Sequence, residues 1–238
     1  MKQWVIPDLH GCLRTLIGMI EDRIRPTKED ELYFLGDYVD RGPDPKGVLD
    51  YIMNLEEQGF KIFPLRGNHE EYILLALENE RKLKRRFLFF KERNRLYDEW
   101  MSAGGASTMK SFSVNNVNQI PEKYVEWIKR LKYYYILENH ILVHAGLNFS
   151  RRDPFDDLHS ILWASSFTPM PEKVDNKIVI HGHVAVSLEF LQNVLADPSK
   201  KYIPLDTGCH HSERSGMGNL VALELNTMEL LIQPNIEK

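Results

Sequence analysis

The stretch Gly36-Asp37-Tyr38-Val39-Asp40-Arg41-Gly42 follows directly on the run Glu31-Leu32-Tyr33-Phe34-Leu35. The run predicts a buried strand, and the glycines allow the backbone to turn sharply around the charged residues. Asp37 and Asp40 then lie at the carboxyl end of a strand, where open α/β sheets bind ligands. Carboxylates suit hard divalent cations, and the planar fork of Arg41 matches phosphate oxygens. For such a stretch in isolation, a polar turn with a local Asp–Arg ion pair is the first interpretation.

Length and composition predict one globular domain, 1–238. The chain has 43% hydrophobic residues and no linker rich in Gly, Ser or Pro. A formal net charge of -4 gives no field that favours nucleic acid, and no apolar run is long enough to span a membrane. Cys12 and Cys209 alone cannot form a disulfide framework or a cysteine zinc cluster. We therefore expect a cytoplasmic protein without nucleic-acid or membrane partners, and its oligomeric state stays open.

Three strand-like runs in the first part of the chain, 4–6, 31–35 and 61–65, each end in polar side chains. The polar ends are Asp8 and His10, then Asp37, Asp40 and Arg41, then Asn68, His69 and Glu70. About thirty residues separate successive ends, and 13–24 and 48–55 show helical apolar spacing, so the pattern predicts two strand–helix–strand units. All three ends should meet at one edge of a sheet. Asp8 and His10 can face one point if the backbone there stays extended.

The pattern changes over residues 71–131, where charged helical segments without strands predict a helical insertion. Within it, Arg81–Arg86 could bind acidic or phosphorylated partners, although a solvated helix face is the first interpretation, and Phe87–Phe90 are expected to fill core. Strands return afterwards. They are predicted at 140–143, ending in His144, at 177–180, ending in His181 and His183, and at 202–205, 220–225 and 229–232, the last two as a hairpin.

Five predicted strand ends thus bring carboxylate, amide and imidazole groups to one region. A single histidine is usually structural, but the joint pattern is typical of a dinuclear metal centre. The ordered motifs D-x-H-G, G-D-x-V-D-R-G, G-N-H-E, H-A-G and a late G-H resemble the signature of the calcineurin-like metallophosphoesterases. The resemblance is to the serine/threonine phosphoprotein phosphatase family in particular, and to its small bacterial and phage lambda phosphatase-like members. It extends from Asp8 to about Gly218.

This resemblance implies an α/β fold, a four-layer α/β/β/α sandwich, and a role for each motif residue. The metal ligands it implies are Asp8 and His10 for a first metal, Asp37 as the bridge, and Asn68, His144 and His183 for the second. The other roles it implies are His69 as the general acid, Asp40 as the residue that orients His69, and Arg41 with Asn68 as the phosphate-binding residues. Mixed nitrogen and oxygen ligation permits two ions of manganese, iron or zinc, and manganese is the expected metal.

The implied activity is hydrolysis of phosphate monoesters by in-line attack of a metal-bridging hydroxide. Two divalent metals lower the pKa of a shared water and neutralise charge on the phosphoryl group. Phosphoserine and phosphothreonine in proteins are the first expected substrates. A hydrolase of diadenosine tetraphosphate or another small phosphoanhydride is the alternative within the same fold. An inactive phosphoprotein-binding module is the alternative of another class.

The sequence departs from the family pattern at Ser165. In Leu162-Trp163-Ala164-Ser165 the serine stands where the family commonly has an arginine, a second phosphate ligand. Arg151 or Arg152, near in sequence, could replace that charge. His181 could be a further ligand, although a structural role is preferred because the family's G-H motif matches His183.

Overall fold

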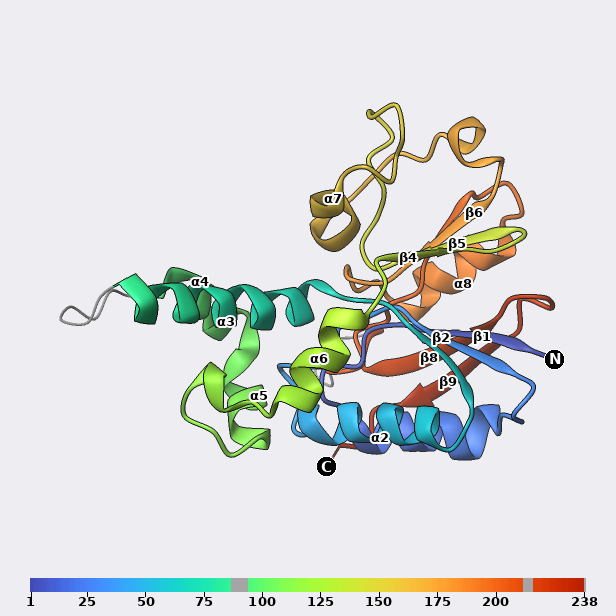
Figure 1. The fold of residues 1–238 in the computed structure, drawn as a ribbon. Coiled ribbons are helices and arrows are strands. Elements are labelled where there is room, and N and C mark those ends of the chain that lie inside the picture. The colour runs from blue at the N-terminus through green and yellow to red at the C-terminus, as the bar shows by residue number, and fades with distance from the viewer. Residues whose placement is uncertain (87–93, 212–215, 238) are drawn as a thin grey trace.

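The computed structural model describes residues 1–86, 94–211 and 216–237 as two facing β-sheets with helices on the outside (Figure 1). The strands are β1 (Gln3–Ile6), β2 (Glu31–Phe34), β3 (Lys61–Pro64), β4 (Tyr134–Ile136), β5 (His140–Val143), β6 (Ile178–His181), β7 (Tyr202–Pro204), β8 (Asn219–Glu224) and β9 (Leu230–Pro234). They form one sheet in the order β3-β2-β1-β8-β9 and another in the order β4-β5-β6-β7. The predicted mixed α/β sandwich of two sheets between helices is confirmed.

The helices fall into three groups along the chain. Over the first sheet run α1 (Leu13–Ile17), η1 (Gly18–Ile24) and α2 (Pro45–Glu57). Between β3 and β4 come α3 (Asn68–Arg86), α4 (Arg95–Trp100), η2 (Met101–Gly105), α5 (Ala106–Ser111), η3 (Val117–Gln119) and α6 (Glu122–Arg130). The second half contains α7 (Leu158–Trp163), η4 (Pro171–Val174) and α8 (Leu188–Ala196). Among the described residues, no helix is both long and apolar enough to cross a membrane.

Strand alternation separates the apolar layers. Trp4 and Ile6 of β1 pack under α1, η1 and α2, whereas Val5 faces the space between the two sheets. Successive side chains of a strand point to opposite faces, so one short strand serves both layers. The outer face of the second sheet packs separately, where Val143 and Val179 meet Ile161 of α7.

The predicted strand–helix–strand units are present, because β1 pairs with β2 and β2 with β3, both in parallel. The predicted terminal hairpin is also present, since β8 and β9 pair antiparallel. One boundary is wrong. The helical segment expected from residue 71 already begins at Asn68, so Asn68, His69 and Glu70 lie in the first turn of α3.

Two further features of the secondary structure differ from the sequence prediction. The helix expected over 13–24 widens to a π-helix from Gly18, where the missing side chain leaves room for Gln233 of β9. The short edge strand β4 and the helices α7 and α8 were not expected. β4 has three residues and α7 has six, too few to show a clear period, whereas Leu188, Leu191 and Val194 of α8 do have helical apolar spacing. Arg81 forms an exposed ion pair with Glu122, as on a solvated helix face. Phe87–Phe90 lie outside the described residues, and the single-domain organisation stays a prediction.

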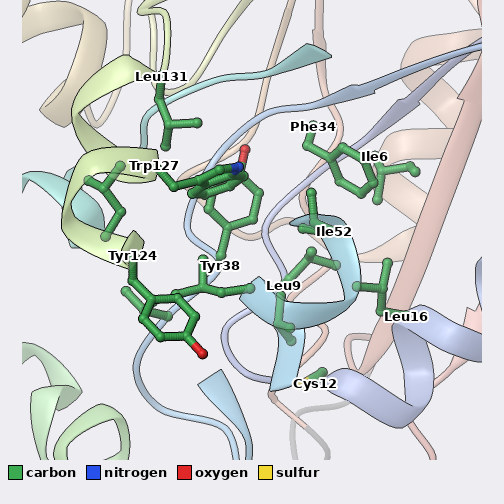
Figure 2. Packing of buried hydrophobic residues seen from close by; sticks show 14 of the residues in the cluster. Ile6, Leu9, Cys12, Leu16, Phe34, Tyr38, Ile52, Tyr124, Trp127 and Leu131 are labelled. Carbon is green, nitrogen blue, oxygen red and sulfur yellow. The ribbon is translucent and has the colours of Figure 1, made fainter. Parts of the chain in front are cut away.

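Tyr38 joins the loop after β2 to the helical segment between β3 and β4. Its ring is fully buried and lies edge to face against the ring of Trp127, with 5.4 Å between the ring centroids. Figure 2 shows both side chains in the core. Its hydroxyl donates to the carbonyl of Leu65 at 2.7 Å. The loop that carries Asp37 and Asp40 is therefore anchored in the hydrophobic core through Tyr38.

We predict that Tyr38→Phe lowers the free energy of unfolding by about 1–2 kcal/mol, because it removes a buried hydrogen bond and leaves the Leu65 carbonyl unpaired. Urea denaturation followed by circular dichroism measures the change. The control is Tyr51→Phe, whose hydroxyl meets Glu21 at the surface and should matter by less than about 0.5 kcal/mol. Equal effects of the two variants would contradict the assignment of this bond as a structural anchor.

Candidate metal centre

The structure brings the nine residues of the predicted site together at the carboxyl ends of five strands. They are Asp8 and His10 after β1, Asp37, Asp40 and Arg41 after β2, Asn68 and His69 after β3, His144 after β5, and His183 after β6. Most of these side chains are buried, and His144 and Asp40 are completely inaccessible. The site thus lies where the edges of both sheets meet.

Two groups of donor atoms could each hold a metal ion. One consists of His10, Asp37 and His69, the other of Asp37, His144 and His183, and within each group the donor atoms lie within 4.8 Å of one another. Asp37 belongs to both groups. Its Oδ2 lies 3.5 Å from His10 Nε2, and its Oδ1 lies 3.5 Å from His144 Nε2. One carboxylate that offers an oxygen to each side has the geometry of a bridging ligand.

Backbone carbonyls fix the orientation of two of these imidazoles. His10 Nδ1 lies 3.0 Å from the carbonyl of Val39, and His144 Nδ1 lies 2.9 Å from the carbonyl of Leu35. A carbonyl only accepts, so Nδ1 carries the hydrogen and Nε2 keeps its lone pair for a ligand. Burial lowers the pKa of both rings and keeps them neutral. Both are therefore prepared as nitrogen donors.

Asn68 adds an oxygen to the second group. Its Oδ1 lies 2.9 Å from His144 Nε2 and 3.0 Å from His183 Nδ1. Since His144 Nε2 has no hydrogen to donate, two lone pairs face each other at short distance. A cation between them would turn that repulsion into coordination, and mixed nitrogen and oxygen donors suit manganese, iron or zinc.

Asp8 lies beside this group rather than inside it. Both of its carboxylate oxygens accept from the backbone N–H of His183 at 3.1 Å, and any Cβ on Gly182 would collide with this carboxylate. Burial, with the charges of Asp206 and Asp37, raises the pKa of Asp8 well above its ordinary value. Three acidic groups in one buried region repel one another, which again fits a site for divalent cations.

Asp206 is a site residue that the sequence analysis did not assign. It follows β7, is 3% exposed, and burial raises its pKa to about 6. The sequence does contain a signal, because Asp206 follows the predicted strand 202–205, much as Asp8 and Asp37 follow theirs after one intervening residue. None of the family's motifs includes Asp206.

His69 and Asp40 form a buried pair. His69 Nδ1 lies 2.6 Å from Asp40 Oδ2. Burial opposes protonation of His69, but the charge of Asp37 and the hydrogen bond to Asp40 outweigh it and raise the pKa of His69 above its ordinary value. Asp40 also accepts from Trp100 Nε1 at 2.9 Å and from Thr108 Oγ1 at 2.5 Å. These two partners come from the helical segment and were not predicted.

Arg41 places its guanidinium over the histidines. Nη1 lies 2.9 Å from His10 Nε2, and Nη2 lies 3.0 Å from His69 Nε2. Gly104 comes so close that a Cβ there would lie 2.9 Å from Arg41 Cγ, and its φ of 119° also favours glycine. The side chain itself is exposed, so this cation faces solvent at the mouth of the site. An anion that enters the site would meet it first.

The backbone around the site is strained, contrary to the extended conformation expected between Asp8 and His10. Five non-glycine residues here have a positive φ, namely His10, Asp37, Asp40, Arg41 and His183. Each such conformation costs on the order of 1–3 kcal/mol and persists only where its surroundings impose it. Glu70 supplies much of that constraint. Its buried carboxylate accepts from the backbone N–H groups of Asp37, Tyr38, Val39 and Gly67, at 2.9 to 3.3 Å.

Ser165 and the arginines proposed to replace its missing charge lie elsewhere. Ser165 is exposed and lines a cavity with Phe167 and His181. Arg151 and Arg152 are exposed too, and within the described part of the chain neither side chain forms a hydrogen bond or ion pair with a residue of the site. His181 lies outside both donor groups, with its ring against Phe167 and its Nδ1 3.1 Å from the carbonyl of Gly182. Its surroundings agree with a structural role.

Comparison with known proteins gives one family. Residues 1–214 match the family described as calcineurin-like phosphoesterase. The chain is 27% identical to a symmetrical bis(5'-nucleosyl)-tetraphosphatase of Nitrosospira multiformis over 150 residues, which cover 62% of this chain and 44% of that protein. It is 34% identical to the enzyme of the same name from Wigglesworthia glossinidia brevipalpis over 84 residues, 35% of this chain and 30% of that protein. The chain thus spans less than half the length of these curated relatives.

Solved structures show the same fold. A proposed diadenosine tetraphosphatase is 18% identical with a TM-score of 0.62, covering 98% of this chain and 93% of that one. A serine/threonine phosphatase from Saccharomyces cerevisiae is 15% identical with a TM-score of 0.64, covering 98% of this chain and 79% of that one. At such low identity, these likenesses concern the fold alone.

We predict that Glu70→Gln destabilises the protein by about 1–3 kcal/mol, because an amide NH2 would face backbone N–H groups that need an acceptor. Chemical denaturation measures this. Glu78→Gln on the same helix is the matched control, since Glu78 only forms an exposed ion pair with Lys82. A loss no larger than in the control would show that Glu70 does not hold the loop.

Proposed function

The chain belongs to the calcineurin-like phosphoesterase family, and we propose that it hydrolyses the phosphoanhydride chain of dinucleoside polyphosphates such as diadenosine tetraphosphate. The main support is that the curated relatives carry the name symmetrical bis(5'-nucleosyl)-tetraphosphatase. Protein phosphoserine and phosphothreonine, the first substrates expected from the sequence, have a counterpart in a fold neighbour at 15% identity, a likeness that concerns the fold alone. The alternative stated with that expectation is therefore the better one.

The donor atoms fit two divalent cations that share Asp37. His10 and Asp37, with Asp8 alongside, would hold one, and Asp37, Asn68, His144 and His183 the other. Bound there, such cations supply Lewis acidity towards water and the phosphoryl oxygens. The donor set suits manganese, iron and zinc alike, so manganese stays a prediction, as does the cytoplasmic location.

Arg41 would bind the phosphoryl group that reacts. Its two Nη atoms are close to His10 and His69, so a phosphate held by this guanidinium lies next to both rings. A planar guanidinium donates two parallel hydrogen bonds to phosphate oxygens, which fixes the direction of the leaving bond. In-line attack by water then requires only that the face of the phosphorus atom opposite the leaving oxygen be turned towards the donor groups around Asp37.

His69 would donate the proton that the departing oxygen needs. Asp40 accepts from Nδ1, so the second proton of the imidazolium lies on Nε2, the atom that faces Arg41. As the water oxygen bonds to phosphorus, it releases one of its protons to solvent. As the bond to the bridging oxygen breaks, the Nε2 proton goes to that oxygen. Trp100 and Thr108 hold Asp40, so this proton stays aimed at one place.

We predict that metal-stripped protein regains turnover of diadenosine tetraphosphate with manganese, zinc or magnesium, at a higher kcat/KM than for a phosphoserine peptide. Asp37→Asn should lower kcat/KM by about 1,000-fold, since it removes the shared charge at both metal positions and with it several kcal/mol of transition-state stabilisation. Chromatographic product analysis measures both. Turnover of the peptide but not the dinucleotide would return the assignment to a protein phosphatase. Tight binding of phosphopeptide without turnover of any substrate would favour the inactive module.

We further predict that His69→Asn has an effect that depends on the leaving group. A general acid contributes about 10²–10⁴-fold where the departing oxygen is basic. The loss should therefore be large for an alkyl phosphate and smaller for a phosphoanhydride or aryl phosphate, whose leaving groups depart as stable anions. Calorimetry should still find two bound ions in this variant. The same loss for all substrates would contradict the acid role.

A further inference from the structure

A cavity of about 520 Å³ beside Arg41 has no part in the steps above. Arg41 and His210 line it at the edge of the metal centre, and Ser107 and Lys110 of α5 line it further out. His210 Nε2 lies 3.4 Å from Arg41 Nη1, and the His210 ring lies 4.6 Å from that of His10. The cavity is therefore continuous with the place where Arg41 would hold the reacting phosphate.

The charges that line the cavity favour an anion. The overall charge of the chain is -4, yet two cations, Arg41 and Lys110, line this one cavity. Among the described residues that line it, Glu237 is the one carboxylate, and its Oε1 accepts from the backbone N–H of Thr15 at 2.8 Å. No hydrogen bond or ion pair within the described ranges engages Lys110 Nζ. This ammonium group is thus available to a ligand.

The backbone of Lys110 is held beside the Arg41 loop. Thr108, two residues before Lys110, donates to Asp40, which precedes Arg41. Ser111, which follows Lys110, donates to Asp44 at 2.8 Å and accepts from the backbone N–H of Lys46 at 3.0 Å. Since α5 is attached to the Arg41 loop on both sides, the backbone of Lys110 keeps its place beside that loop, and the lysine side chain lines the same cavity as Arg41. Two cations that line one cavity favour a ligand with two or more linked anionic groups.

We propose that this cavity is the subsite for the phosphates beyond the one that is attacked, an inference that rests on the proposed function. Lys110 is then the residue that selects a polyphosphate chain over a phosphate monoester. Arg41 holds the reacting phosphate on one side and borders the cavity on the other. The next phosphate groups of the chain pass Arg41 and reach the Lys110 ammonium. A phosphate monoester ends at Arg41 and gains nothing from Lys110.

The test uses Lys110→Met, the cation-preserving Lys110→Arg, and Lys200→Met as a matched control, since Lys200 is a surface lysine before β7 that pairs only with Asp197. Calorimetry with the full-length, metal-loaded protein measures the Kd of tripolyphosphate and of inorganic phosphate. Lys110→Met should raise the Kd of tripolyphosphate about tenfold or more, as expected for the loss of a charge-assisted hydrogen bond, and that of inorganic phosphate less than twofold. Lys110→Arg should restore most of the tripolyphosphate affinity.

Kinetics give the second readout. In Lys110→Met the KM for diadenosine tetraphosphate should rise about tenfold with little change in kcat, because the lost contact lies away from the reacting atoms. A Kd for tripolyphosphate within twofold of the wild type would overturn the subsite, even if the dinucleotide is a substrate. Conversely, the wild type could bind tripolyphosphate through Lys110 and yet cleave no dinucleotide. That result would support the subsite and contradict the proposed function.

Discussion

The carboxylate of Glu70 is the constraint on which the rest of the site depends. It accepts from four backbone N–H groups, three of them in the loop after β2 and one before α3. Those bonds hold Asp37 in a conformation that a free chain avoids, so that its two oxygens face opposite sides. The neighbouring imidazoles can then share one carboxylate. Without the hydrogen bonds of Glu70, the loop after β2 would adopt another conformation, and Asp37 could no longer belong to both donor groups.

A second constraint is the balance of charge around that shared carboxylate. Burial disfavours its charge, yet the pKa of Asp37 lies far below its ordinary value, because each nearby imidazole, His144 foremost, would attract the carboxylate as soon as the ring took up a proton. Burial instead raises the pKa of Asp8 and Asp206. Raised pKa values show that these two carboxyl groups have too little positive charge around them, and divalent cations would supply it.

The strand ends were predictable from the sequence because each combines an apolar run with a polar residue directly after it, as at Asp8, Asp37 and His144. Their meeting at one edge follows from parallel pairing, which the helical spacing between them indicates. Trp100 and Thr108 could not be found in this way. Both belong to the helical segment between β3 and β4, which folds back so that they contact Asp40. No local sequence pattern indicates which side chains of that segment will lie next to Asp40. The π-helical widening at Gly18 likewise depends on Gln233, a residue far away in the chain.

The position of β1 in its sheet has a consequence for biosynthesis. Trp4 pairs with Leu32 on one side and with Glu224 on the other. While the chain emerges, β1 can pair with β2 early, but its other edge stays open until β8 has been made. Closing so long a loop is slow, and an open strand edge can pair with other chains in the meantime. The strand that precedes Asp8 is thus made well before β8, the strand that covers its second edge.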